Sequence, residues 1–438
     1  MSLANLARRL RLGEASPGEL LASQRDSIAR RNKELRAFIS VFGGRPPGQP
    51  RNMAVYGVTL AVKDNIYVMG HRTTAGSRIL RRFVPERDAE VVARLKRAGA
   101  VVIGKSNLHE FAYGVTNINP HFGDCHNPWR PDRISGGSSG GSAVAVATGM
   151  ACAGLGTDTA GSIRIPAALC GVVGYKPTYG AISRRGVVPL AWGLDTVGLI
   201  ARSVADAAFL ASLATDAGGP VPRQPKGRRG LRVGVPTNVL GHMDKEVRRS
   251  FDGALAASET GGVQLRRFSL RHLDETSACR TLIGMAEAAS YHRRYFLGRS
   301  AEYGRDVRRR IAQGLAIPAA AYLDALRARG SLIGYYRSLF RSFDVIALPT
   351  TRIAAPTIRA SKDEETAAGI RTDLLSLTEI FNVYGAPAIS IPCGVTGEGL
   401  TVGLQLAADL GADDLLLSAA MKLEGVLSAR NNPLHFGN

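Results

Sequence analysis

Two serines in glycine-rich segments and a lysine far upstream are the residues best suited, by type and spacing, to covalent chemistry. Ser138 lies in the sequence GGSSGGS and Ser162 in GTDTAGSIR, while Lys63 ends the apolar run VTLAVK. Glycines let the backbone bend sharply and expose N–H groups to a reacting atom. A hydroxyl nucleophile needs such donors and a base, and a lysine is a base when its neutral form is populated. The three residues indicate nucleophilic chemistry at a serine.

The segments that must hold these residues predict an α/β architecture. Residues 58–63 alternate apolar with small or polar side chains, which predicts a strand with Lys63 on the same face as two small residues. A helix over 88–98 and a strand over 101–103 should follow. This strand–helix–strand order is typical of α/β proteins.

The rest of the chain predicts more helices and strands within one domain. Hydrophobic spacing favours helices over 1–40. The small apolar run 143–155 predicts a buried helix, too short to cross a bilayer. Downstream we expect strands at 231–235, 345–348 and 388–391, a largely helical segment over 245–343 and a closing helix over 413–423. The expected domain, 1–438, then comprises N-terminal helices (1–50), a first half of the core (55–217), a basic Pro/Gly linker (218–230) and a second half with a helical lobe (231–438).

The composition is that of a globular protein, with 45% hydrophobic and 21% charged residues among 438. The five cysteines are odd in number, dispersed and in no CxxC pair. This argues against a disulfide framework or a zinc site and favours a cytoplasmic location. We expect no cofactor and no metal.

A net charge of +20 raises the question of a polyanionic partner such as RNA. The densest basic cluster lies in the Pro/Gly-rich segment and comprises Arg223, Lys226, Arg228, Arg229 and Arg232. No base-stacking motif accompanies this cluster, and aromatic residues make up only 6% of the chain. We therefore expect the charge to be spread over a solvated surface.

The segment 136–177 resembles the signature of the amidase signature family, serine amide hydrolases that use a Ser-Ser-Lys triad. The likeness covers most of residues 55–425 and takes in VKDN at 62–65, GKSN at 104–107, CGVVGYKPT at 170–178, LDTVG at 194–198, PAISIP at 387–392 and GLQ at 403–405. The resemblance implies a single large α/β domain, in which a mixed sheet is covered by helices on both sides.

The resemblance also implies roles for the three residues. Ser162 would be the nucleophile that becomes an acyl ester. Ser138 would be the bridging serine that passes the proton of Ser162 toward Lys63, the neutral base. Burial at the end of an apolar strand would lower the pKa of Lys63 from the value near 10.4 of a free lysine.

The turn around the nucleophile supplies the other expected groups. Successive N–H groups of Thr159, Ala160 and Gly161 would bind the developing oxyanion. We expect Asp158 and Arg164 to preorganise this loop through charge-assisted hydrogen bonds. Ser139 is a further loop-supporting residue.

Rival assignments exist for the bridge and for the base. Ser139 and Ser142 compete with Ser138, although backbone hydrogen bonding or helix capping is the simpler role for Ser142. Lys105 also follows a strand, but only Lys63 has the Val-Lys-Asp-Asn context. Asp64 would oppose a neutral Lys63 if it were close, so we expect its carboxylate to point elsewhere.

The sequence departs from the common family pattern where Ala160 replaces a glycine and Gly193 replaces a serine. The methyl group of Ala160 could narrow the pocket and would make a left-handed conformation costly. We expect variable residues to build the substrate pocket, namely 113–122 and 300–385.

Two other classes of site share part of this pattern. GGSSG also fits the G-x-S-x-G nucleophile elbow of α/β-hydrolases. That motif needs a preceding strand, which the two prolines within 127–135 disfavour, and none of the eight histidines has a triad context. A phosphate-binding loop would need a Gly-Lys-Ser/Thr ending, which is absent here.

The expected function is therefore hydrolysis of a linear carboxylic acid amide to the acid and ammonia or an amine. The alternative is the amidase subunit of a glutamyl-tRNA(Gln)/aspartyl-tRNA(Asn) amidotransferase, which releases ammonia from glutamine. Ala160 and Ile165 favour the free-standing enzyme. We expect a small-molecule amide substrate, no membrane contact, and no nucleic-acid partner unless the chain belongs to such an amidotransferase. A homodimer is compatible with this expectation.

Overall fold

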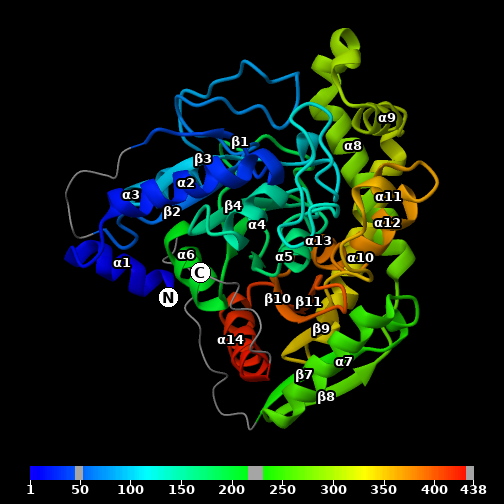
Figure 1. Ribbon diagram of the computed structural model, residues 1–438. Coiled ribbons are helices and arrows are strands. Elements are labelled where there is room, and N and C mark those ends of the chain that lie inside the picture. The colour runs from blue at the N-terminus through cyan, green and yellow to red at the C-terminus, as the bar shows by residue number, and fades with distance from the viewer. Residues whose placement is uncertain (45–52, 216–229, 431–438) are drawn as a thin grey trace.

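In the part of the chain that the structure describes, the protein is built around one mixed sheet of eleven strands (Figure 1). The computed structural model describes residues 1–44, 53–215 and 230–430. In sheet order the strands are β1 (Phe38–Val41), β3 (Val101–Ser106), β2 (Thr59–Lys63), β4 (Ala153–Asp158), β6 (Thr196–Ala201), β5 (Val173–Lys176), β10 (Ala388–Val395), β11 (Thr401–Ala407), β9 (Val345–Pro349), β7 (Leu231–Pro236) and β8 (Val263–Phe268).

Both parallel and antiparallel pairs occur in this sheet. Strand β2 runs parallel to β3 and β4, and β7 runs parallel to β8 and β9. The two halves of the chain meet where β5 pairs antiparallel with β10, from Ala388 opposite Lys176 to Ser390 opposite Gly174. This pairing makes the two halves one domain.

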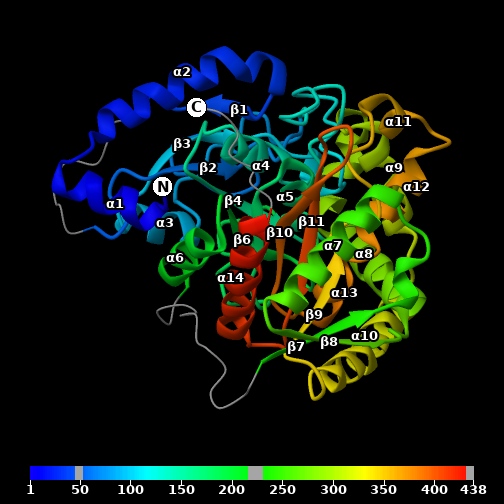
Figure 2. The same ribbon diagram turned by 60° about the horizontal axis from the view of Figure 1, so that its bottom comes forward.

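Helices cover both faces of the sheet (Figure 2). They are α1 (Leu3–Leu12), α2 (Pro17–Leu35), α3 (Glu90–Arg97), α4 (Gly140–Ala147), α5 (Arg164–Cys170), α6 (Val204–Ala214), α7 (Lys245–Thr260), α8 (Leu273–Arg299), α9 (Arg305–Leu315), α10 (Ala319–Leu339), α11 (Ile358–Lys362), α12 (Ala367–Leu375), α13 (Ile380–Tyr384) and α14 (Asp413–Arg430).

The alternation along β2 separates two cores, because successive side chains of a strand point to opposite faces. Leu60 and Val62 belong to the large cluster that includes residues of α6, α7 and α14. Ala61 belongs to a second cluster, with residues of α2, α4 and α5. Lys63, two residues after Ala61, therefore lies on the face covered by α4 and α5.

Most elements expected from the sequence are present. The N-terminal residues form two helices, and α2 begins at Pro17 with Ser16 as its N-cap, whose hydroxyl accepts from the N–H of Glu19 at 3.3 Å. Long helices α8 and α10 form the helical lobe of the second half. The single-domain α/β fold, with helices on both sides of a mixed sheet, is confirmed.

One prediction about secondary structure was wrong, and another, the largely helical segment 245–343, was right but incomplete. The run 143–155 is not one helix, because α4 ends at Ala147, Gly149 turns the chain at φ +73°, and β4 begins at Ala153. The segment 245–343 also contains a strand, β8, which extends the sheet edge beside β7. Local composition did not distinguish this edge strand from its helical surroundings.

Some predictions concern residues outside the described ranges. The linker 218–230 lies outside them except for Gly230, and so do Arg223, Lys226, Arg228 and Arg229 of the basic cluster. Arg232 is described and pairs with Asp344 at 2.8 Å. Within the described ranges, no helix is both long and apolar enough to span a membrane.

Candidate active site

The candidate residues gather at the carboxyl ends of two neighbouring parallel strands. Lys63 is the last residue of β2, and Asp158 is the last residue of β4. Ser138 lies just before α4, and Ser162 lies just before α5. Because both helices cover the face onto which Lys63 projects, the fold brings together residues that are far apart in sequence.

The amine of Lys63 is fully buried and has three close oxygen neighbours. Its Nζ lies 2.7 Å from Oγ of Ser138, 2.8 Å from Oγ1 of Thr157 and 3.3 Å from the Thr157 carbonyl oxygen. A neutral amine has two hydrogens to donate and one lone pair to accept. Both oxygens of Thr157 can take the two hydrogens, which leaves the lone pair for the hydroxyl of Ser138.

Burial makes this neutral form accessible near pH 7. Burial lowers the pKa of Lys63 to about 7, because the charged ammonium loses its hydration, although the carboxylates of Asp158 and Asp195 act in the opposite direction. Asp64, the next residue along the chain, turns its carboxylate away from Lys63, as expected. That carboxylate pairs instead with Lys105 at 3.0 Å.

Lys105, the rival base, has a different environment. It is as buried as Lys63, and it also donates to Oγ1 of Thr73 at 2.8 Å. Burial lowers the pKa of Lys105, while its ion pair with Asp64 raises it. An ammonium held by a carboxylate has no lone pair to offer, so this geometry is that of a structural lysine.

The turn that carries Ser162 is organised by the carboxylate of Asp158. One oxygen accepts from the N–H of Gly161 at 2.7 Å, and the other accepts from the N–H of Ile163 at 3.1 Å. Gly161 has φ +128°, and a Cβ there would meet Oγ1 of Thr378 at 2.2 Å, so only glycine fits.

This arrangement corrects the expected set of oxyanion donors. The N–H of Gly161 is engaged by Asp158 and is not available to a substrate. Within the described ranges, the N–H groups of Ala160 and Ser162 have no hydrogen-bond partner, so the Ser162 N–H replaces that of Gly161 in the candidate set. Ala160 is not among the residues with positive φ, so its methyl group imposes no backbone strain.

Arg164 holds the same turn through its guanidinium group. This group is fully buried and makes a bidentate ion pair with Asp158, at 2.9 and 3.1 Å. Burial would raise the pKa of Asp158, but the charge and hydrogen bonds of Arg164 hold it well below its usual range. The remaining N–H groups of Arg164 donate to Thr378 O, Gln405 Oε1 and Asn382 Oδ1.

The serine-rich loop is tied to this turn through its backbone. The N–H of Ser139 donates to the Ser162 carbonyl oxygen at 3.1 Å, and the hydroxyl of Ser139 donates to the Thr157 carbonyl oxygen at 3.2 Å. Ser142, a rival for the bridge, instead contacts Ser106 and the Leu155 carbonyl oxygen. Within the described ranges, no hydrogen bond joins the hydroxyls of Ser138 and Ser162.

Two polar residues of this site were not predicted from the sequence. Thr157 holds the amine of Lys63, and Asp195 accepts from the Thr159 hydroxyl at 2.5 Å. Burial raises the pKa of Asp195 to about 6, against the hydrogen bonds it accepts. Both residues lie in stretches matched to the family, GTDT and LDTVG, so their motif membership was the available signal.

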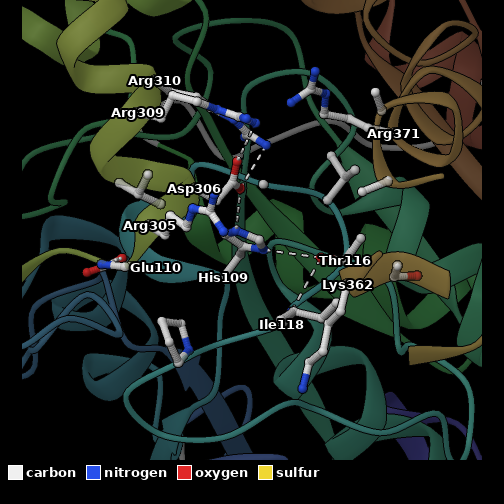
Figure 3. Close-up of a pocket in the computed structure, with 18 of the residues that line it drawn as sticks. His109, Glu110, Thr116, Ile118, Arg305, Asp306, Arg309, Arg310, Lys362 and Arg371 are labelled. Carbon is white, nitrogen blue, oxygen red and sulfur yellow. Dashed lines mark hydrogen bonds and ion pairs between the residues drawn. The ribbon is translucent and has the colours of Figure 1, made fainter. Parts of the chain in front are cut away.

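A cavity of about 430 Å³ lies beside the site (Figure 3). Its walls come from residues 109–120, 304–310 and 361–371, within or next to the segments expected to form the substrate pocket. The side chains of Lys63, Ser138 and Ser162 do not line it. However, the N–H of His109 donates to the Ser138 carbonyl oxygen at 3.3 Å, so this wall contacts the serine-rich loop.

Among the described residues, no group of three or more His, Cys, Asp or Glu side chains is placed to hold a metal ion. All five cysteines are buried and unpaired.

Comparisons with known proteins give matches over most of the chain. A family model described as Amidase matches residues 45–417. Curated relatives include the A subunit of the glutamyl-tRNA(Gln) amidotransferase of Thermus thermophilus, 38% identical over 95% of each chain. Similar solved structures include a crystal structure of an amidase, with a TM-score of 0.89 and 33% identity over 98% of this chain and 100% of the other. The corresponding A subunit from Thermotoga maritima has a TM-score of 0.82 and 35% identity, over 95% of this chain and 93% of the other.

Proposed function

This chain belongs to the amidase signature family, and from that premise we propose that it hydrolyses a carboxylic acid amide through an acyl-enzyme on Ser162. The observation that carries the proposal is the buried contact of 2.7 Å between Lys63 Nζ and Ser138 Oγ. It supplies a base of suitable pKa next to a hydroxyl that both donates and accepts hydrogen bonds.

In the proposed first step, Oγ of Ser162 bonds to the amide carbon while the carbonyl π electrons move to oxygen. The proton of Ser162 passes to Ser138, whose own proton goes to the lone pair of Lys63. The N–H groups of Thr159, Ala160 and Ser162 support the oxyanion; losing one such donor typically costs about 2.7–4 kcal/mol of barrier.

Collapse of this intermediate breaks the carbon–nitrogen bond. The ammonium of Lys63 returns a proton through Ser138 to the departing nitrogen, which leaves as ammonia or an amine. Water then attacks the acyl ester, and the same relay removes its proton and restores the hydroxyl of Ser162. Asp158 and Arg164 take no proton in this scheme and keep the turn in position.

The names of the curated relatives favour glutamine as the amide and a tRNA-dependent amidotransferase as the assembly. They outweigh the expectation of a free-standing enzyme that rested on Ala160 and Ile165. The free-standing enzyme is the second candidate, supported by the crystal structure of an amidase that covers this chain almost completely.

The test is to assay ammonia release from glutamine and from simple amides by the purified chain. The same chain then replaces its relative in the Thermus thermophilus amidotransferase, and amidated tRNA is measured. We expect ammonia release that depends on Ser162, and restored tRNA amidation under the amidotransferase proposal. Hydrolysis of simple amides without restored amidation would favour the free-standing enzyme, and no hydrolysis of any amide in either setting would refute the proposed function.

A further inference from the structure

A loop over residues 190–195 carries Asp195 to the nucleophile turn. The carboxylate of Asp195 accepts from two N–H groups of its own loop at 2.9 and 3.1 Å, and from the hydroxyl of Thr159 at 2.5 Å. One buried carboxylate thus closes the loop on itself and fastens it beside the candidate oxyanion donors. Burial lowers the pKa of Lys63, and the charge of Asp195 acts against this shift. The position of the loop therefore affects both the oxyanion site and the base.

A second carboxylate holds the same loop from the helical lobe. Glu287 lies on α8 and is 7% exposed. Its Oε2 accepts from the N–H of Gly193 at 2.7 Å, and its Oε1 accepts at 2.9 Å from the hydroxyl of Tyr322 on α10, the other long helix of the lobe (Figure 1). Within the described ranges Glu287 forms no ion pair. Burying a carboxylate without a paired cation costs stability, so stabilisation of the fold is a poor explanation for this residue.

Gly193 leaves room for this carboxylate. A Cβ at position 193 would lie 2.9 Å from Oε1 of Glu287, so one of the two groups would have to move. Gly193 is not among the glycines with positive φ, so the backbone itself does not require a glycine there. The common family pattern has a serine at this position, and its side chain would compete with Glu287 for the same space. The departure of the sequence at Gly193 and the buried Glu287 are thus two parts of one contact.

We propose that Glu287 is a positioning residue that fixes the 190–195 loop, and through it Asp195, against the nucleophile turn. The inference rests on the proposed function, because it gives the loop a role at the same oxyanion site and base. Glu287 acts through Gly193, which is two residues before Asp195 in the chain. The helical lobe thereby contributes to catalysis without supplying a group to the triad.

The charges around the base give this role a signature in the pH profile. Two carboxylates act on Lys63, those of Asp158 and Asp195. Asp158 is fixed by Arg164, so Asp195 is the carboxylate whose distance depends on the loop. If the loop loosens, Lys63 loses a nearby negative charge and its pKa falls, because less negative charge favours the neutral amine. The rising limb of kcat/KM then moves to lower pH.

Two cations lie near the loop and stay unchanged in the test. Burial raises the pKa of Asp195, and the charge of Arg184 acts in the opposite direction. Arg329, on α10, has its Nη1 3.5 Å from the place of a Cβ at Gly193, and its Nε donates to the Val383 carbonyl oxygen at 2.9 Å. Because both cations are kept in every variant, a shift of the limb reports the position of Asp195.

The test compares variants at the two ends of the contact in the full chain. Glu287→Ala removes the acceptor, Glu287→Gln keeps an acceptor oxygen without the charge, and Gly193→Ser brings a side chain against the carboxylate. Glu275→Ala is the matched control, because Glu275 is exposed on the same helix and pairs with His272. Values of kcat and KM are measured for ammonia release from glutamine and from acetamide over a range of pH.

We expect Glu287→Ala to lower kcat about ten- to hundredfold and to move the limb to lower pH, because a small misplacement around the nucleophile has effects of this size. Glu287→Gln should stay close to the parent in rate and profile, and Glu275→Ala should match the parent. Gly193→Ser should resemble Glu287→Ala, and the double variant should cost less than the sum of the single ones, because both remove the same contact. An unshifted limb in Glu287→Ala, an equal shift in Glu287→Gln, or additive costs would overturn the positioning role.

Hydrogen exchange separates this inference from the proposed function. Amide exchange over residues 190–195, followed by mass spectrometry, needs no catalysis. Glu287→Ala should speed exchange in this loop, and Glu287→Gln should not. Faster exchange confined to the loop would support the positioning role even if no amide were hydrolysed. Unchanged exchange in Glu287→Ala, or faster exchange throughout α8 and α10, would show that Glu287 does not act on the loop and would overturn the proposal.

Discussion

At the scale of single residues, the proposed chemistry depends on one amine that loses its charge near neutral pH. Lys63 and Lys105 are equally buried, lie at the ends of neighbouring parallel strands and differ mainly in their partners. The carboxylate of Asp64 forms an ion pair with Lys105, which makes Lys105 a structural cation. Lys63 has only neutral oxygens in direct contact, and this difference makes it the better candidate for the base.

Ser162→Ala should lower kcat for amide hydrolysis by roughly four orders of magnitude or more, because removing the nucleophile removes most of the contribution of the whole triad. Lys63→Ala should be nearly as damaging. Kinetics on folded protein, checked by circular dichroism, provide the measurement. Ser142→Ala is the control and should stay active, since its hydroxyl contacts Ser106 and Leu155 rather than Lys63. Normal turnover by Ser162→Ala would reject the assignment.

The pH dependence of kcat/KM should show a limb that rises through about pH 7. Below this pH Lys63 is protonated and has no lone pair, and above it the neutral base accumulates. Asp195→Asn should move this limb to lower pH, because a nearby carboxylate raises the pKa of Lys63. A shift to higher pH, or a profile without a rising limb, would contradict Lys63 as the base.

At the scale of the elements, the turn between β4 and α5 depends on a buried ion pair. Asp158 accepts from two N–H groups of the turn, and Arg164 links it to β11 through Gln405 and to α13 through Asn382. The pair thus joins the turn that carries Ser162 to a strand and a helix from the second half of the chain.

Arg164→Leu should destabilise the protein by about 3–5 kcal/mol, because it leaves Asp158 as an unpaired buried charge. Denaturant unfolding gives the free-energy change. The exposed pair of Arg327 and Asp324 provides the comparison, and Arg327→Gln should cost at most about 1 kcal/mol. If Arg164→Leu does not fold, Arg164→Lys should fold with reduced stability, since it keeps the charge. Equal stability of Arg164→Leu and the parent would contradict the role given to this pair.

At the scale of the whole molecule, one chain supplies all three residues of the candidate triad, while the net charge of +20 is a property of the whole sequence. The first fact means that the proposed triad itself requires no residue from a partner. The net charge affects how the isolated chain binds tRNA.

We expect tRNA binding by the isolated chain to be weak, unspecific and strongly dependent on salt. Contacts to phosphates release counterions, so the logarithm of the binding constant should fall linearly with the logarithm of salt concentration. Fluorescence titrations with several tRNAs over a range of salt test this expectation. Tight, salt-resistant binding of a single tRNA would instead indicate a dedicated recognition surface on this chain.

The sequence alone was enough to identify the candidate residues and element boundaries that short local patterns mark. The alternation over 58–63 placed Lys63 at a strand end beside small side chains, and the glycine-rich segments identified Ser138 and Ser162. The preference of Pro17 for a first helical turn placed the start of α2 correctly. Each of these inferences needs only neighbouring residues, because strand pleat, helix capping and glycine turns act over a few positions.

Only the tertiary structure decided which polar groups meet. Local sequence does not indicate that Thr157 binds the amine of Lys63. Nor does it indicate that Asp158 accepts a hydrogen bond from the N–H of Gly161, which removes this N–H from the candidate oxyanion donors. The segments 109–120 and 361–371 become two walls of one charged cavity only through the packing of α9, α11 and α12 beside the serine-rich loop that carries Ser138. Hydrogen bonds and charge balance depend on contacts between residues tens to hundreds of positions apart, and the fold alone establishes those contacts.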